Sequence, residues 1–110
     1  MSTEYTFVAD VVKEVTIPEN GILSRTLHSD ERSKLLLFGF APGQELSAHT
    51  APMPAILYIA QGEATLRLGG DVREAGAGTL VHMPPLLEHG IQAKTEVVMV
   101  LVLLKQPRQS

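Results

Sequence analysis

The residues of this chain that can carry out chemistry are few, and its four histidines come first among them. A histidine nitrogen binds transition metals or exchanges hydrogen bonds with a ligand. Because the chain has no cysteine, it has neither disulfides nor thiolate ligands, so a metal would have to rest on histidine and carboxylate. His28 adjoins the polar 29–32 turn and is expected at the surface, which leaves His49, His82 and His89 as candidates.

Two histidines are not a complete ligand set for the usual catalytic metals. A catalytic zinc usually has three protein ligands, and the non-heme iron triad has two histidines and a carboxylate. If His49 and His89 supply two ligands, the third has to come from one of four side chains, namely His82, Glu45, Glu88 or Gln61. We therefore expect a divalent Fe, Mn, Ni, Cu or Zn ion to be weakly held or absent.

Three of these candidates for the third ligand have a visible problem. Val81 and Met83 make an inward-facing pair on one strand, which turns His82 outward. Glu88 directly precedes the last histidine and points away from it, while Glu45 lies in the loop before His49. We expect both glutamates to be solvated.

Short apolar segments separated by glycine, proline or charged turns recur at the spacing of an all-β sandwich or barrel. They predict strands over 22–28, 34–40, 55–61, 63–68, 72–74, 79–83, 89–94 and 97–104. Gly69-Gly70 predicts a two-residue hairpin with a type I′ turn, since both central positions of that turn have positive φ. Residues 4–15 are predicted as a short helical turn or an edge strand, and 17–21 as a turn.

Length and composition restrict the class of protein. A chain of 110 residues forms one domain, with a barrel core over 22–104, an N-terminal segment over 1–21 and a tail over 105–110. With 45% hydrophobic residues and a net charge of -3, it is not disordered and has no basic surface for nucleic acid. No apolar run approaches the roughly 20 residues that span a bilayer, and Glu4 and Asp10 stand where a signal peptide is basic. We expect a cytoplasmic protein that contacts neither nucleic acid nor membrane.

Two segments have no polar face. Residues 97–104 are eight consecutive apolar residues, and 35–40 contain no polar residue, so both faces of each strand should be buried. A single barrel interior buries only one face. The outer face is covered by the N-terminal segment, by the other sheet or by a second copy of the chain. Because an exposed apolar face of that size is a liability for a monomer, we expect a homodimer.

His49 lies in a stretch that resembles the first motif of the cupin superfamily. That motif is a glycine, five residues, a His-x-His pair, a glutamate three or four residues later, and a glycine after six more. Gly43, His49 and Gly62 keep their places in this frame. The second histidine is replaced by Ala51 and the glutamate by Ala55, so one of three family ligands remains in this half.

His89 lies in a stretch that is similar to the second family motif. Gly78, Pro84 and His89 match its first glycine, its proline and its histidine. The family's turn glycine is Leu86 here, and its asparagine is Ala93. The resemblance covers about residues 24–104 and is closest to small single-domain, RmlC-like cupins of the conserved-barrel type. It implies an all-β double-stranded β-helix, or jelly roll, with His49 and His89 facing one cavity.

Strand parity extends the candidate site beyond the histidines. His49 and Ala51 are two residues apart, so on an extended strand they point the same way. The next strand presents alternate residues to the same interior, and the resulting wall is small and apolar. The predicted ligand-binding residues are His49, Ala51, Ala55, Leu57, Ile59, Met83 and His89.

Three functions follow as hypotheses. The leading one is a metal-independent domain that binds a small molecule in an apolar cavity, oriented by hydrogen bonds to His49 and His89. The second is a divalent-metal enzyme, of the dioxygenase or isomerase kind found among cupins, in which His49 and His89, with either waters or His82, hold the metal. The third is a dimerisation or interaction module without a ligand. Whether the chain is an enzyme stays open, although the absence of cysteine and of a G-x-S-x-G elbow disfavours nucleophilic catalysis.

Overall fold

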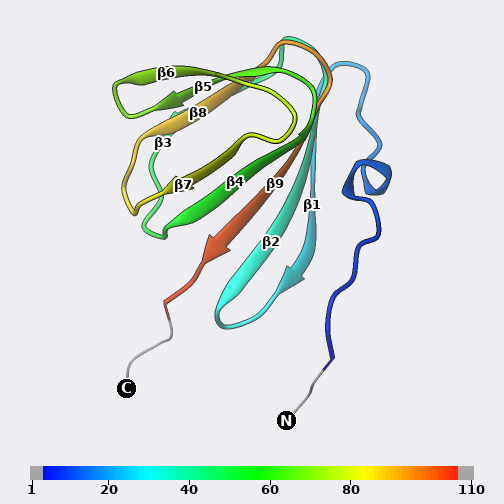
Figure 1. Cartoon of the computed structure of the whole chain (residues 1–110), viewed down its shortest axis with the longest axis vertical. Coiled ribbons are helices and arrows are strands. Elements are labelled where there is room, and N and C mark those ends of the chain that lie inside the picture. Colours follow the sequence, from blue (N-terminus) through cyan, green and yellow to red (C-terminus); the bar gives the residue numbers. More distant parts are fainter. Residues whose placement is uncertain (1–3, 107–110) are drawn as a thin grey trace.

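Two antiparallel β-sheets packed face to face make up the fold in the computed structural model, which describes residues 4–106 (Figure 1). The five-stranded sheet has the order β1 (Ile22–Ser29), β2 (Ser33–Phe40), β9 (Val97–Leu104), β4 (Ala55–Gln61), β7 (Leu80–Met83). The four-stranded sheet has the order β3 (Glu45–His49), β8 (His89–Ala93), β5 (Ala64–Leu68), β6 (Asp71–Ala75). A short 3-10 helix, η1 (Val11–Glu14), precedes the first strand. The fold is the all-β jelly roll that the sequence predicts.

The outer ends of the chain, 1–3 and 107–110, lie outside the described residues, and with them parts of the predicted N-terminal segment and tail. Within 4–106, no helix is both long and apolar enough to cross a membrane. The cytoplasmic location stays a prediction.

All eight predicted strands are present, with ends that shift by at most one residue. One further strand, β3, was not predicted from the sequence. The prediction that Glu45 lies in a loop is wrong, because this residue begins β3. Four of the five residues in β3 are exposed, and only Leu46 is partly buried. Its side chains therefore show no alternation, and its pairing with β8 is what makes it a strand.

The hairpin at Gly69-Gly70 is present, with Leu68 paired to Asp71 directly across the turn. Gly69 has a φ of 63°, whereas Gly70 has no positive φ. This pattern belongs to a type II′ turn, so the predicted type I′ is wrong. Both turn types match the twist of the flanking strands, which is why the sequence pattern does not separate them.

The core between the sheets is apolar throughout. Phe40, Ile59 and Leu66 are fully buried and come from three different strands, and the Phe38 and Phe40 rings stack with centroids 6.1 Å apart. No polar or charged residue in the described range is buried. Polar chemistry in the interior is therefore restricted to side chains at its open margin.

The N-terminal segment covers part of the outer face of the five-stranded sheet. Leu37 and Val98 are completely buried although neither belongs to the core between the sheets. A Cβ at Gly39, which pairs with Val98, would lie 2.9 Å from the Val15 side chain. The N-terminal segment was one of the three covers expected for the outer face of the apolar strands, and it covers one end of that face.

An ion pair holds the segment in place. A guanidinium nitrogen of Arg25 on β1 lies 3.0 Å from the Glu14 carboxylate and also donates to the Glu14 carbonyl.

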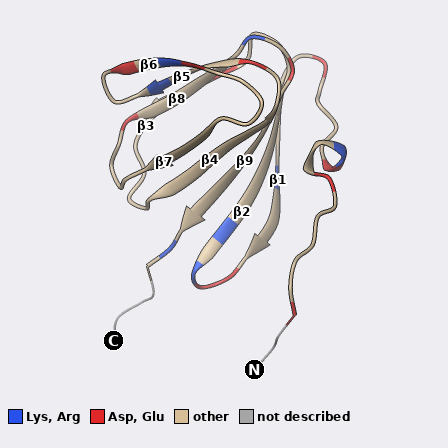
Figure 2. Ribbon diagram, viewed as in Figure 1, with Lys and Arg blue, Asp and Glu red and all other residues tan. Residues whose placement is uncertain are grey.

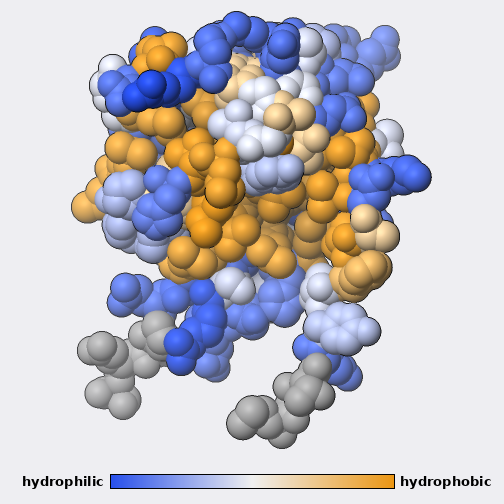
Figure 3. Space-filling model, in the orientation of Figure 1, coloured by the Kyte–Doolittle hydropathy of each residue, from blue (hydrophilic) through white to orange (hydrophobic). Residues whose placement is uncertain are grey.

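The remainder of that outer face stays accessible and is largely apolar, with His82 beside Leu80 on β7. Tyr58 on β4 is 40% exposed and Leu80 on β7 is 68% exposed, and these two residues are paired. β4, β7 and β9 carry no Lys, Arg, Asp or Glu (Figure 2). Figure 3 shows hydrophobic side chains across the middle of the molecule and hydrophilic ones towards its two ends. The homodimer stays a prediction.

Candidate functional site

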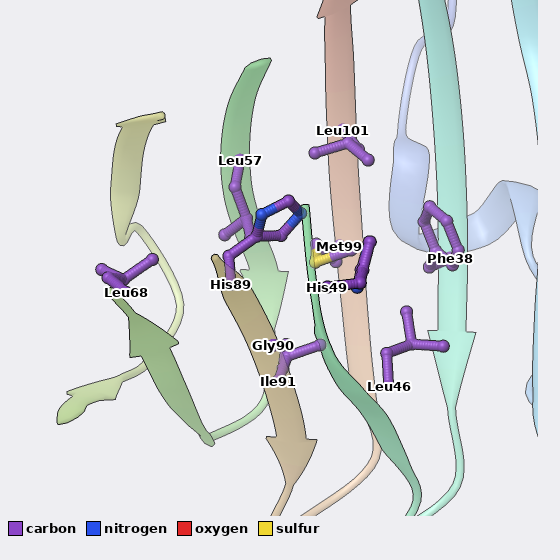
Figure 4. A pocket seen from close by; sticks show the side chains of 10 residues that line it. All are labelled: Phe38, Leu46, His49, Leu57, Leu68, His89, Gly90, Ile91, Met99 and Leu101. Carbon is purple, nitrogen blue, oxygen red and sulfur yellow. The ribbon is translucent and has the colours of Figure 1, made fainter. Parts of the chain in front are cut away.

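His49 and His89 lie next to each other across two strands of the four-stranded sheet. They are direct cross-strand partners on β3 and β8, so their side chains leave the sheet on the same side. Their ring centroids are 4.4 Å apart and the rings are tilted by 53°. Figure 4 shows both rings in the space between the sheets. We call these two residues the histidine pair.

Both rings of the histidine pair are oriented by the backbone. Nδ1 of His49 donates to the carbonyl oxygen of Ser47, and Nδ1 of His89 donates to that of Leu87, each at 2.9 Å. A carbonyl oxygen only accepts, so in the neutral ring the hydrogen is on Nδ1. The lone pair of each Nε2 is therefore free to accept a hydrogen bond or to ligate a metal.

An apolar cavity of about 70 Å³ adjoins the histidine pair (Figure 4). His89 is partly buried, whereas His49 is exposed and lies where the cavity meets solvent. Among the described residues that line the cavity, only these two have polar side chains. The others are Phe38, Leu46, Leu57, Leu68, Gly90, Ile91, Met99 and Leu101.

A β-bulge in β3 sets the direction of His49. The register pairs Leu46 with Ile91 and His49 with His89, so two residues of β3, Ser47 and Ala48, oppose a single residue of β8. Leu46 and His49 both line the cavity, although residues three apart in a regular strand face opposite sides. Regular alternation along β3 would place Ser47 on the same side of the strand as His49, and the bulge interrupts that alternation.

The structure brings only part of the predicted ligand-binding set to the cavity. Leu57 lines it together with the histidine pair. Ala55, Ile59 and Met83 are buried in the core but are not among the lining residues, because the interior around them is closed by packed side chains. Ala51 lies beyond the end of β3, where its carbonyl accepts from the Leu86 amide at 2.8 Å. The parity argument for Ala51 therefore fails, since the strand ends at His49.

Seven cavity residues were not singled out as site residues from the sequence: Phe38, Leu46, Leu68, Gly90, Ile91, Met99 and Leu101. Alternation along β5 and β9 identifies some of them as inward-facing. It does not tell which inward residues border a cavity, because that depends on how the two sheets are aligned.

His82 does not join the histidine pair. It is exposed on β7, paired with Ile56, while its neighbours Val81 and Met83 pack on the core. Glu45 and Glu88 are exposed as well. Gln61 is half-buried beyond a register shift in β4 and does not line the cavity.

The ligand set of a cupin metal centre is not present near the histidine pair. Ala51 and Ala55 stand where the family has a histidine and a glutamate. Residues 4–106 contain no group of three histidine, aspartate or glutamate side chains placed to hold a metal ion. Two neutral imidazoles without a carboxylate fall short of the three protein ligands of a catalytic site, so these residues do not fit that centre.

The loop before His89 contains an unusual backbone. Leu86 has a φ of 69°, and no other non-glycine residue in the described range has a positive φ. This is the position where the second family motif has its turn glycine. The left-handed conformation brings the Cβ of an L-residue close to the carbonyl oxygen and costs roughly 1–2 kcal/mol.

Within residues 4–106, one ionisable group has a clearly shifted pKa, and it lies elsewhere, in the turn between β1 and β2. The His28 imidazole, 2.6 Å from the carboxylate, and the amides of Arg32 and Ser33 hold the pKa of Asp30 well below its usual value. His28 also bonds to the Thr6 hydroxyl. This cluster is at the surface, as expected for His28, and does not contribute to the cavity.

Comparison with known proteins places the chain among others of this architecture. A family model for the cupin domain matches residues 36–104. A search of curated proteins found no match.

Solved structures correspond over nearly the full chain. A conserved protein of unknown function from Streptococcus pyogenes is 28% identical, with a TM-score of 0.84, covering 96% of this chain and 92% of that one. A cupin superfamily protein from Desulfitobacterium hafniense is 22% identical, with a TM-score of 0.85 and 94% of each chain covered. An RmlC-like cupin from Shewanella frigidimarina is 18% identical, with a TM-score of 0.78, covering 94% of this chain and 93% of that one. None of these names states a ligand or a reaction, so the likeness establishes the fold.

Proposed function

The match over residues 36–104 makes this chain a member of the cupin domain family, and on that premise we propose that it binds a small molecule in the cavity beside His49 and His89. The observation that carries the proposal is the composition of the cavity wall. It combines an apolar interior with two imidazoles whose Nε2 lone pairs are free. Such a wall suits a ligand with an apolar body and a hydrogen-bond donor at one end.

The volume of the cavity restricts the size of the ligand. About 70 Å³ is far below the roughly 300–1,000 Å³ of pockets that enclose drug-sized molecules. A ligand is therefore small, or only its inner end is enclosed. Because His49 is exposed, the donor end of the ligand lies towards solvent and the apolar end lies among buried side chains of the lining such as Leu57 and Met99.

The two alanines in the first motif favour binding without a metal. Ala55 is 4% exposed, and a carboxylate at this position would need a partner that the apolar core does not offer. With alanine at 51 and 55, the two histidines can still accept hydrogen bonds. The glutamate that would balance the charge of a divalent ion is replaced by Ala55.

Phenol and anisole provide a matched pair of probes, since they share a ring and differ in the hydroxyl hydrogen. We expect phenol at millimolar concentrations to shift the methyl NMR signals of Leu57, Ile91 and Leu101, and anisole to bind more weakly. His89→Leu removes the ring nitrogens and should weaken phenol about fivefold, the loss expected for a hydrogen bond worth about 1 kcal/mol. His82→Leu is the control and should leave phenol binding unchanged, because His82 lies outside the cavity.

Two results would contradict this function. One is an absence of methyl shifts with either probe up to its solubility limit. The other is equal affinity for phenol and anisole in the wild-type protein, which would remove the hydrogen-bonding role of the histidine pair.

A divalent-metal enzyme that uses His49 and His89, with either waters or His82, is the alternative function. It needs a third ligand at the pair, and the exposed position of His82 on β7 argues against it. Elemental analysis of protein purified without chelating resin tests this alternative. A stoichiometric metal that is lost in His49→Leu and in His89→Leu, but kept in His82→Leu, would favour a metal site without His82.

The third hypothesis was a dimerisation or interaction module without a ligand, but a dimer by itself is compatible with ligand binding, and we propose a second copy of this chain as the occupant of the exposed apolar face. The face around Tyr58 and Leu80 is uncharged, so its complement is another uncharged apolar face, as a two-fold interface between identical copies provides. Light scattering after size exclusion should give a dimer for the wild type and a monomer for Tyr58→Lys/Leu80→Lys. A monomeric wild type at micromolar concentration rejects the dimer and leaves the cavity proposal intact.

A further inference from the structure

We propose that Gly90 is the positioning residue of His49: glycine at this place in β8 permits the β-bulge that turns the His49 ring into the cavity. The inference deepens the proposed function and rests on it for the importance of the histidine pair. Gly90 contributes only backbone to the cavity wall and acts through His49.

At the bulge, a segment of β3 that is one residue longer lies opposite a segment of β8. From Leu46 to His49 the chain advances three residues, whereas their partners Ile91 and His89 are two residues apart. Without the bulge, the strand would alternate regularly from Leu46 onwards. Ala48 would then face the cavity and His49 would face solvent.

Only glycine leaves room for this arrangement. A Cβ at position 90 would lie 2.9 Å from the Ala48 nitrogen and 2.9 Å from the Leu46 carbonyl oxygen. Both are backbone atoms of the bulge, so they cannot rotate away as the end of a side chain can. Gly90 has no positive φ, and its strand conformation therefore suits alanine. The requirement for glycine comes from the close approach of β3.

A side chain at position 90 should therefore displace His49 and leave His89 in place. To accommodate a Cβ, β3 must lose its bulge or move away from β8, and either change removes His49 from the pair. His89 is held independently of β3, because it pairs with Leu68 of β5 and its Nδ1 bonds to the Leu87 carbonyl.

A deletion offers a specific rescue. Removing Ala48 takes out the extra residue of the bulge, so that Leu46 and His49 become two positions apart and face the same side of a regular strand. A regular β3 lies at the usual distance from β8 and has room for alanine at position 90. The test compares Gly90→Ala, the Ala48 deletion and the two changes together.

The primary measurement is the proton NOE between the His49 and His89 rings, whose centroids are 4.4 Å apart in the wild type. We expect the NOE to be lost in Gly90→Ala and present in the deletion variant and in the double variant. Phenol affinity should fall about fivefold in Gly90→Ala, as for the loss of one hydrogen bond, and return to within twofold of wild type in the double variant. Because the NOE needs no ligand, it tests Gly90 even if phenol does not bind.

Gly70→Ala is the matched control for the loss of a glycine, since a Cβ at position 70 meets nothing within 4 Å and the residue has no positive φ. It should keep both the NOE and phenol binding. A persistent NOE in Gly90→Ala overturns the proposal. If Gly90→Ala does not fold, the double variant decides: a folded protein with the NOE supports the proposal, and a protein that is unfolded or lacks the NOE rejects it.

Discussion

Two strand pairs, β2–β9 and β3–β8, differ in regularity, and the difference separates what holds the fold together from what forms the candidate site. In the five-stranded sheet, β2 and β9 pair without a shift from Ser33 with Leu104 to Phe40 with Val97. In the four-stranded sheet, β3 is short, mostly exposed and bulged where it meets β8. Regular pairing of apolar strands buries the surface that stabilises the protein, whereas the histidine pair depends on an irregularity that costs free energy.

The largest loss of stability is therefore expected in the regular β2–β9 pair. Phe40→Ala removes a fully buried ring and should lower the free energy of unfolding by about 3–5 kcal/mol, measured by denaturant titration. His49→Leu, in the irregular strand, should change it far less, because His49 is exposed. Equal losses in the two variants would show that β3 carries as much of the stability as the five-stranded sheet.

A smaller effect, with the opposite sign, is expected in the irregular region. Leu86→Gly should raise the free energy of unfolding by about 1 kcal/mol, because glycine adopts a positive φ without the steric cost that Leu86 bears. Val72→Gly is the control, as Val72 is also largely exposed, 58% against 69%, but lies in strand β6. That variant should be destabilised by roughly 0.5–1 kcal/mol. If both variants change stability in the same direction, the strain at Leu86 is not significant.

The smallest effect should come from the surface turn that joins β1 and β2, outside both of these strand pairs. Since the pKa of Asp30 is lowered in the folded protein, its carboxylate stabilises the fold above the ordinary value of 3.8, and this contribution is lost as the pH falls below it. Asp30→Asn should therefore lower the melting temperature slightly at pH 7, and the difference from wild type should shrink at pH 3. Glu31→Gln removes the same charge from the same turn and should have no effect at either pH. A difference for Asp30→Asn that grows on acidification would contradict this assignment.

The sequence by itself determined the strands that bury one face. Their apolar residues alternate over the whole of each strand, as in Ala64, Leu66 and Leu68 of β5, and glycines or prolines separate them. Alternation is a local property, because each side chain faces the core or solvent according to its place in its own strand. The resemblance to the two cupin motifs likewise implied the barrel and made His49 and His89 candidate site residues.

Only the tertiary structure decided the direction of His49, the walls of the cavity and the cover over Leu37. Each of these depends on a contact between distant segments: the bulge against Gly90, the alignment of the two sheets, and the N-terminal segment on the five-stranded sheet. Parity counted along β3 gives the wrong side for Ser47 because one extra residue inverts it, and the extra residue is visible only from the strand opposite. Contacts across strands therefore determine the site, while patterns within strands determine the fold.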